Sequence, residues 1–135
     1  MLAAMVLGAD AIQVGSRFVA SEESSAHQAF KQVVVDAKEG DTQLTLKELA
    51  PVRLIKNKFY NDLQELYKTG PTTEQLKELL GRARAKRGMF EGDLEDGELE
   101  IGQITGLIHN IKPVAQIVKE MVAEFNEAKI QVNSF

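Results

Sequence analysis

A single segment of this chain, residues 9–15, has the pattern of a strand buried on both faces. Ala11, Ile12 and Val14 place apolar side chains on both sides of the segment, as in a parallel strand covered by helices. Parallel strands need neighbours joined by long crossover connections. The rest of the sequence does not alternate strands with helices, so we expect the partners of this strand to lie outside the 135 residues.

The segments on either side of this strand are predicted to be helical. Residues 2–7 are good helix formers without an N-cap, and Gly8 should end that helix. Ser21 is expected to cap a second helix that runs to about Lys38. A helix, a strand, a glycine turn and a further helix match the last unit of a (β/α)8 barrel.

Residues 41–135 are expected to form a mostly helical lobe. The stretch from Gly40 to Leu46 should be a loop or a short extended piece, and a helix with apolar residues one turn apart should end near Gly70. Thr72 and Gln75 match a capping box, which predicts a helix from Thr73 to about Lys86.

The last part of the chain contains one connection and one long helix in this interpretation. The glycine-rich, acidic stretch from Gly88 to Glu100 should be a surface connection. Pro113 should open the final helix, whose apolar stripe we expect to be buried against other helices of this chain or of a neighbouring copy. The stripe consists of Val114, Ile117, Val118, Met121, Val122, Phe125 and Ala128.

Composition excludes several classes of function. Hydrophobic residues make up 44% and charged residues 27% of the chain, which is typical of a folded domain, and the net charge of -4 argues against nucleic-acid binding. The one basic cluster is read as the last turn of a helix, with phosphate binding as the alternative. The absence of cysteine, of a signal peptide pattern and of an apolar run of roughly 18–20 residues favours a cytoplasmic protein with no membrane span. The basic cluster is Arg82, Arg84, Lys86 and Arg87.

The turn after the candidate strand could hold an anion. Gly15 permits close approach to the backbone, and Ser16 adds a hydroxyl beside successive amide hydrogens. The alternative is a plain tight turn, because strand–Gly–Ser turns are common.

Three segments resemble the nitronate monooxygenase family, which includes flavin-dependent enoyl-acyl-carrier-protein reductases. Residues 7–20 (LGADAIQVGSRFVA), followed by Glu22, Glu23 and His27, are similar to the eighth-strand signature of that family. Residues 51–57 (PVRLIKN) and 102–108 (GQITGLI) resemble its C-terminal lobe.

The resemblance implies an FMN-binding barrel whose flavin phosphate is held by the loop after the eighth strand. The family's usual Gln-x-Gly-Thr stands here as Gln13-Val14-Gly15-Ser16, a change that keeps the hydroxyl. It further implies that Gly102 and Gln103 line the cavity near the flavin, with a simple helix-start turn as the equal alternative. Residues 1–40 would be the last strand–helix unit, and residues 41–135 the lobe.

No catalytic residue or metal site is predicted in this chain. The histidine that relatives use for proton abstraction precedes the region that this chain resembles, and His27 and His109 are expected to have structural or surface roles. Asp93 and Glu95 are expected to be solvated loop residues rather than an acid–base pair.

The leading hypothesis is that the chain is a fragment of an FMN-dependent oxidoreductase of the nitronate monooxygenase type, inactive on its own. A reductase acting on an enoyl thioester is one alternative, and a non-enzymatic helical module that forms homo-oligomers is the other. The expected partners are the flavin and a small nitronate or enoyl thioester, with no nucleic acid and no membrane.

Overall fold

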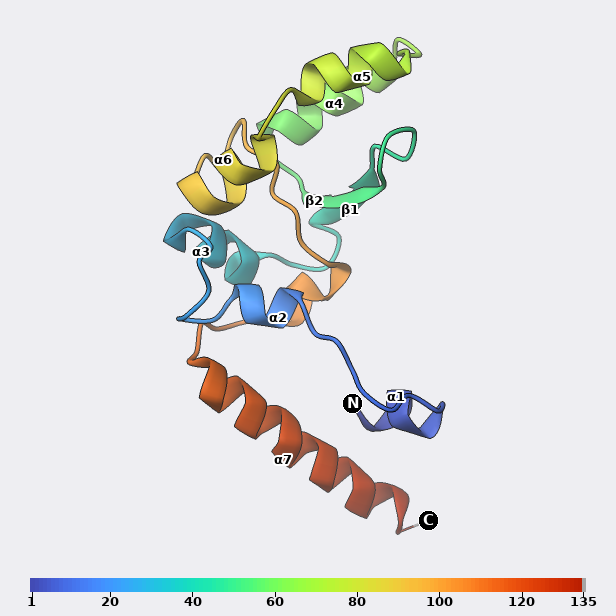
Figure 1. Cartoon of the computed structure of the whole chain (residues 1–135), viewed down its shortest axis with the longest axis vertical. Coiled ribbons are helices and arrows are strands. Elements are labelled where there is room, and N and C mark those ends of the chain that lie inside the picture. The colour runs from blue at the N-terminus through green and yellow to red at the C-terminus, as the bar shows by residue number, and fades with distance from the viewer. Residues whose placement is uncertain (135) are drawn as a thin grey trace.

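The computed structural model describes residues 1–134 and is built mostly from helices (Figure 1). Helices α4 and α5 lie at one end of the curved molecule, α1 and α7 lie at the other, and α2, α3 and the 3-10 helix η1 lie between them. The expected helical majority is confirmed. The elements are α1 (Leu2–Val6), α2 (Ser16–Val19), α3 (Gln28–Asp36), β1 (Thr42–Thr45), β2 (Val52–Ile55), α4 (Lys58–Tyr67), α5 (Thr73–Leu80), α6 (Arg84–Glu91), η1 (Gln103–Leu107) and α7 (Val114–Val132).

The sheet of the described residues is small. Strands β1 and β2 are antiparallel, with Thr42 opposite Ile55. An extended segment, residues 99–101, runs along the other side of β2, where the Ile55 amide donates to the Leu99 carbonyl at 3.0 Å and the Ile101 amide donates to the Arg53 carbonyl at 3.1 Å. The sheet therefore brings a segment from late in the chain beside β2.

Residues 11–14 do not form a strand, which contradicts the sequence prediction. They have no ladder partner among residues 1–134 and connect α1 to α2 as an irregular segment. Ala11 and Ile12 are exposed, and Val14 is half-buried. An apolar pattern alone does not make a strand, because its backbone groups need a neighbouring strand to pair with.

The helix after this segment begins later than predicted. His27 rather than Ser21 caps α3, and its Nδ1 accepts from the Ala29 amide at 3.2 Å. Ser21 is 1% exposed, and its hydroxyl donates to the Phe18 carbonyl at 2.8 Å. The Ser21 hydroxyl therefore binds a carbonyl of the short helix α2, although the sequence pattern predicted that it would cap the next helix.

The capping box of α5 is confirmed, but the helix is shorter than predicted. Thr72 accepts from the Gln75 amide, and the Gln75 side chain accepts from the Thr72 amide. The helix ends at Gly81, where φ is +67°, and Ala83 is also left-handed, with φ of +58°. Two left-handed residues so close together start a separate helix, α6.

Arg84, from the basic cluster, lies in the first turn of α6 and not in the last turn of a helix. Its Nε and Nη2 donate to the carbonyls of Leu80 and Leu79, at 2.8 and 2.9 Å. Its guanidinium also lies 4.5 Å from the ring centroid of Phe59. The prediction that the basic cluster forms the last turn of a helix is therefore wrong, although Arg84 binds the last carbonyls of α5 from the first turn of α6.

The stretch from Gly88 to Glu100 is not the surface connection that was predicted. Its first residues belong to α6, and Gly88, Gly97 and Glu98 are buried. A Cβ on Gly97 would lie 2.3 Å from the Gly88 Cα, and a Cβ on Gly88 would lie 2.6 Å from the Glu98 carbonyl oxygen. Glycine is needed at positions 88 and 97 because the backbone of α6 is in close contact there with the backbone of residues 97–98.

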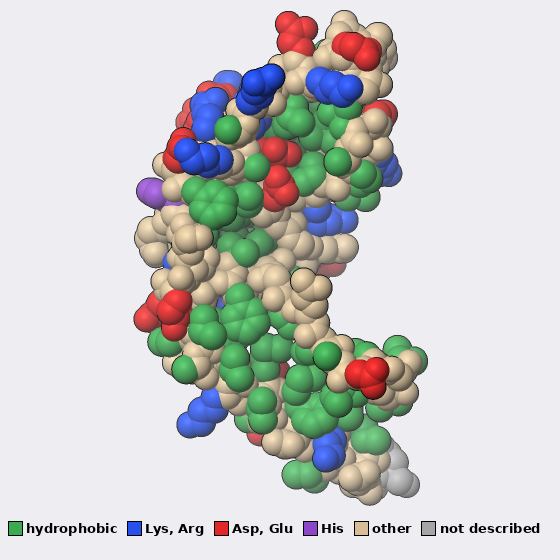
Figure 2. Space-filling view, viewed as in Figure 1, with side chains coloured by type: hydrophobic (Ala, Val, Ile, Leu, Met, Phe, Trp, Pro, Cys, Tyr) green, Lys and Arg blue, Asp and Glu red, His purple; other side chains and the backbone are tan. Residues whose placement is uncertain are grey.

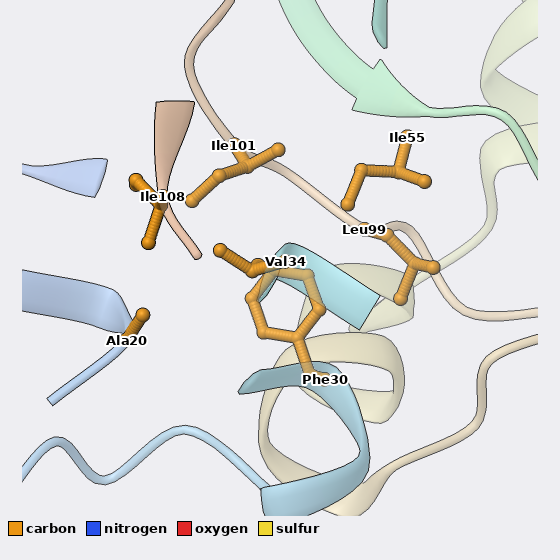
Figure 3. Close-up of a cluster of buried hydrophobic side chains, with 7 residues drawn as sticks. All are labelled: Ala20, Phe30, Val34, Ile55, Leu99, Ile101 and Ile108. Atoms are coloured by element: carbon orange, nitrogen blue, oxygen red, sulfur yellow. The ribbon is translucent and has the colours of Figure 1, made fainter. Parts of the chain in front are cut away.

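Two hydrophobic clusters hold the molecule together. The larger one joins α2, α3, β2, the 99–101 segment and the end of η1 (Figure 3). The smaller one joins the β1–β2 connection to α4 and α5. The larger cluster contains Ala20, Phe30, Val34, Ile55, Leu99, Ile101 and Ile108, and the smaller one contains Leu46, Leu63 and Leu76.

The apolar stripe of α7 is only partly covered within this chain. Pro113 precedes the helix as predicted, but Ile117 is the buried residue of α7, at 1% exposure, whereas Val118 and Val122 are 46% and 47% exposed. The chain alone therefore does not bury the whole stripe, and its coverage by a neighbouring copy stays a prediction. Figure 2 shows hydrophobic side chains gathered over the half of the molecule that contains α1 and α7. Within residues 1–134, no helix has both the length and the apolar character needed to cross a bilayer.

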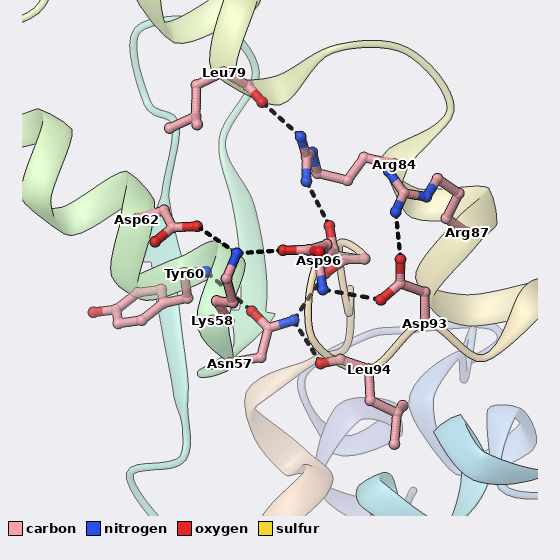
Figure 4. Close-up of polar contacts among 11 residues, drawn as sticks. Asn57, Lys58, Tyr60, Asp62, Leu79, Arg84, Arg87, Asp93, Leu94 and Asp96 are labelled. Atoms are coloured by element: carbon pink, nitrogen blue, oxygen red, sulfur yellow. Dashed lines mark hydrogen bonds and ion pairs between the residues drawn. The ribbon is translucent and has the colours of Figure 1, made fainter.

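Asn57 joins α4 to the turn at residues 93–97 (Figure 4). Its Oδ1 caps α4 by accepting from the Tyr60 amide at 3.0 Å. Its Nδ2 donates to the carbonyls of Leu94 and Gly97, at 2.9 and 2.8 Å. One side chain thus satisfies a helix end and two loop carbonyls.

Replacing Asn57 should cost more than replacing a neighbouring asparagine. We expect Asn57→Ala to lower the free energy of unfolding by about 1–3 kcal/mol, because a cap and two further hydrogen bonds are lost. Asn61→Ala, at an exposed position of α4, is the matched control and should change it by less than about 0.5 kcal/mol. Urea unfolding measures both, and equal effects would contradict the joining role.

Substitutions in α7 should separate its one buried position from its exposed stripe. Ile117→Asp should destabilise the chain by about 2–5 kcal/mol, because packing is lost and a carboxylate is buried. Val118→Asp, at the adjacent exposed position, should leave the thermal midpoint nearly unchanged. If both variants melt alike, α7 is not anchored through Ile117.

Candidate functional site

The two segments that carry the predicted site residues meet in the fold. The Gly102 amide donates to the Ser16 hydroxyl at 3.0 Å, across 86 positions of the sequence. A Cβ on Gly102 would lie 2.6 Å from that hydroxyl oxygen. A larger residue at position 102 would displace the Ser16 hydroxyl, and the Gly102 amide positions the Ser16 side chain.

Arg17 strengthens the same junction. Its Nη1 donates to the Asn110 carbonyl at 3.1 Å, and its Nη2 donates to Asn110 Oδ1 at 2.7 Å. Nη1 also reaches the Ala20 carbonyl at the end of α2. The turn at residues 13–16 and the segment around η1 therefore form one polar unit, although they are distant in sequence.

The predicted site residues differ in their exposure. Gln13, Gly15 and Gln103 are exposed, whereas Ser16 is half-buried. A Cβ on Gly15 would meet no atom within 4 Å. Open space beside this backbone leaves room for a ligand to approach, which is what an anion cradle requires.

A cavity of about 590 Å³ adjoins η1. Gln103 and Arg53 line it, together with the apolar side chains of Ile104 and Leu107. The half-buried Arg53 donates from Nη1 to the Thr42 carbonyl and hydroxyl, each at 3.1 Å, and none of the ion pairs within residues 1–134 involves it. Glu39 also lines the cavity, which therefore combines a cation, a carboxylate that forms no ion pair with it, and an apolar wall.

The two histidines differ in their contacts. His27 caps α3 and packs against Gly92, where an added Cβ would lie 2.4 Å from Nδ1. His109 is exposed. Within the described part of the chain, no three histidine, aspartate or glutamate side chains are grouped as metal ligands would be.

Asp93 is a structural residue rather than a solvated one. Its Oδ1 accepts from the Asp96 amide at 2.9 Å, and Oδ2 accepts from Arg87 (Figure 4). The Asp96 amide, with Arg87 contributing, lowers the pKa of Asp93. Its contacts hold the turn at residues 93–97.

Glu98 has the most perturbed carboxyl group described here. Burial, with a smaller contribution from Glu100, raises the pKa of Glu98 to about 7, and Arg84 opposes the shift. Burial also raises the pKa of Glu100. Glu98 and Glu100 line a second hollow, which lies on the opposite face of β2 from the Arg53 side chain.

Sequence reasoning missed the polar contacts that assemble the site. Arg17 belongs to the motif at residues 7–20, so its place directly after the turn was visible, but its partner Asn110 carried no pattern that could identify it. Arg53 was noted only as part of a family-like segment. Its pairing with Thr42 depends on the register of β1 and β2.

Comparison with known sequences gives one family. The sequence model of the family described as nitronate monooxygenase matches residues 1–124. A probable nitronate monooxygenase of Staphylococcus saprophyticus is 30% identical over 94% of this chain and 36% of its own length. A probable nitronate monooxygenase of Bacillus subtilis is 32% identical over 90% of this chain and 35% of its own length.

Solved structures agree with this result. FabK from Thermotoga maritima matches 99% of this chain with a TM-score of 0.89 and 40% identity, over 42% of its own length. A nitroalkane oxidase from Streptomyces ansochromogenes matches 97% of this chain with a TM-score of 0.71 and 29% identity, over 37% of its own length. The chain thus spans only about a third to two fifths of the relatives that it matches.

A double-mutant cycle tests the contact between Ser16 and Gly102. Gly102→Ala should destabilise the native protein, because the new methyl group would press on the Ser16 hydroxyl. In a Ser16→Ala background the same change should cost less, with a coupling energy of about 0.5–3 kcal/mol. Urea unfolding of the four proteins measures the coupling, and strict additivity would show that the two residues are not in contact.

Glu98 should make the stability depend on pH. Because its pKa is near 7 in the folded chain and 4.5 in its ordinary state, the folded state holds the proton more tightly. The free energy of unfolding should therefore fall as the pH rises from about 4.5 to about 7 and then level off. In a plot of the urea unfolding midpoint against pH, Glu98→Gln should reduce the slope between about pH 4.5 and 7. Glu78→Gln, at an exposed position, should leave that slope unchanged. An unchanged profile in Glu98→Gln would contradict the shift.

Proposed function

Because this chain belongs to the nitronate monooxygenase family, we propose that its turn at residues 13–16 is part of the phosphate site for FMN in a flavin-dependent oxidoreductase. The observation that carries the proposal is the contact between Ser16 and Gly102, since it joins both segments assigned to the flavin. The isolated chain would hold one side of the cofactor, and further contacts would come from residues beyond those that it contains.

The chemistry of the turn suits a phosphate group. The Ser16 oxygen accepts from the Gly102 amide, which leaves the hydroxyl hydrogen available to donate to a phosphate oxygen. The exposed Gly15 offers its backbone beside open space. Gly102 would act through Ser16, because its own amide hydrogen is already used.

When bound, the flavin supplies the oxidation–reduction chemistry, and the protein supplies orientation and electrostatics. This chain would contribute Gln13, Val14, Gly15 and Ser16 at the phosphate and Gln103 at the cavity wall. Arg53 would favour a negatively charged or polarised substrate group beside its guanidinium, whereas Glu39, which lines the same cavity, would disfavour a negative group next to itself. No residue of this chain is proposed to transfer a proton in the reaction.

The comparisons support two substrate classes. The curated relatives are named as probable nitronate monooxygenases, which favours an alkyl nitronate. The higher TM-score and identity of FabK, with the resemblance to enoyl-acyl-carrier-protein reductases, favour reduction of an enoyl thioester. Assaying both substrates on a longer polypeptide that carries this segment would separate the two activities.

A non-enzymatic oligomerising module is the second candidate function. The observation in its favour is the exposed apolar surface of α7, including Val118 and Val122. Such a surface usually faces another protein segment. Sedimentation of the chain, with and without Val118→Asp, would reveal self-association through this helix.

The phosphate proposal predicts a difference between FMN and riboflavin, which lacks the phosphate. We expect the isolated chain to bind FMN only in the millimolar range or more weakly, because a few charge-assisted hydrogen bonds must offset the cost of association. FMN should shift the amide resonances of Gly15 and Ser16, and riboflavin should not.

Two variants sharpen this measurement. Ser16→Ala should weaken the response of the Gly15 amide to FMN, whereas Ser25→Ala, at an exposed serine outside the turn, should preserve it. The phosphate assignment fails if riboflavin shifts the same amides as FMN, or if Ser16→Ala responds like the parent. Saturable micromolar binding would show that the chain needs no further segment to hold the flavin.

A further inference from the structure

A second hollow of about 300 Å³ lies between the β1–β2 connection and the end of α5. Its walls are mainly apolar and include Leu46, Val52 and Leu80. Two carboxylates, Glu98 and Glu100, complete the lining. Figure 2 shows acidic side chains set among hydrophobic ones in the half of the molecule that contains α4 and α5.

The backbone explains why both carboxylates face this hollow. Residues 99–101 run along β2, with Leu54 opposite Glu100. Side chains alternate across an extended segment, so Glu98 and Glu100 point to one side, and Leu99 and Ile101 enter the larger core on the other. The pairing with β2 therefore fixes two carboxyl groups side by side.

Glu98 is buried without a polar partner. The residue is 7% exposed, and its side chain makes no hydrogen bond or ion pair with residues 1–134. No side-chain oxygen or nitrogen among the described residues is both fully buried and unsatisfied. The Glu98 carboxyl must therefore retain some contact with solvent, and the hollow that it lines provides it.

Arg84, the cation that acts on Glu98, already has other hydrogen-bond partners. Arg84 donates to the carbonyls of Leu79 and Leu80 at the end of α5, and to the Asp96 carbonyl. It influences Glu98 through its charge only and forms no ion pair with it. The hollow thus has two acidic groups and no bound positive group of this chain.

We propose that this hollow binds an ammonium group carried on a short apolar chain, with Glu98 and Glu100 as the acceptors. The two carboxylates offer charge-assisted hydrogen bonds, and the apolar walls would cover the hydrocarbon part. The volume is at the lower end of that of small-molecule sites, which limits the ligand to a few carbon atoms. A divalent metal fits poorly, because it prefers six or more oxygen ligands and the walls offer mostly carbon.

Binding of the cation should be coupled to loss of a proton. Glu98 shares its surroundings with Glu100 and Arg84 as the charged neighbours that act on it, and it must be ionised to accept from an ammonium group. An alkylammonium ion keeps its own charge up to about pH 10. The affinity should therefore rise as the pH increases from about 5 to about 8.

The test is an amide chemical-shift titration of the whole chain with n-butylammonium, and with uncharged 1-butanol as the control ligand. We expect butylammonium to bind more tightly than butanol. The affinity for butylammonium should be at least about tenfold higher at pH 8 than at pH 5.5. Glu98→Gln and Glu100→Gln should each weaken it about tenfold, and Glu78→Gln should leave it unchanged. The spectrum of each variant reports directly whether the fold is kept.

Further ligands distinguish the source of the ammonium group. A blocked lysine that binds at least as well as butylammonium would indicate a lysine side chain as the natural occupant, and weaker binding would indicate a free amine. The proposal is overturned if butanol binds as well as butylammonium, if Glu98→Gln and Glu100→Gln both bind like the parent, or if calcium ions occupy the site in preference to the amine.

Discussion

The pairing of residues 99–101 with β2 is the constraint on which the rest of the structure depends. Two backbone hydrogen bonds, from Ile55 to Leu99 and from Ile101 to Arg53, hold a late segment beside an early strand. The segment then continues directly into Gly102, which reaches Ser16. Without this pairing, neither the larger core nor the junction of the two segments of the candidate site would form.

The same pairing separates two chemical environments. On one side of the extended segment, Leu99 and Ile101 complete the hydrophobic core around Phe30. On the other side, Glu98 and Glu100 line an apolar hollow, where burial raises the pKa of both. Side chains alternate along an extended backbone. The register of residues 99–101 against β2 therefore determines both which side chains enter the core and which line the hollow.

The sequence predicted local features better than distant ones. The first helix, the capping box at Thr72 and the position of Pro113 depend on neighbouring residues, and the fold has them as expected. The proposed strand at residues 11–14 failed because a strand depends on what lies across from it in space. The cap at Ser21 failed for a local reason, because its hydroxyl donates to the Phe18 carbonyl. The family and the segments of the candidate site were recognisable from motifs, whereas the hydrogen bond that joins those segments, 86 positions apart, was not.

Amide hydrogen exchange at Gly102 is the most direct test of the central claim, that this residue joins the two segments through the Ser16 hydroxyl. The Gly102 amide should be protected in the parent chain and exchange faster in Ser16→Ala, while the Ile101 amide, bonded to Arg53 in both proteins, should stay protected. If the Gly102 amide exchanges equally fast in the two proteins, the segments are not joined through this contact, and the candidate flavin site loses its structural basis.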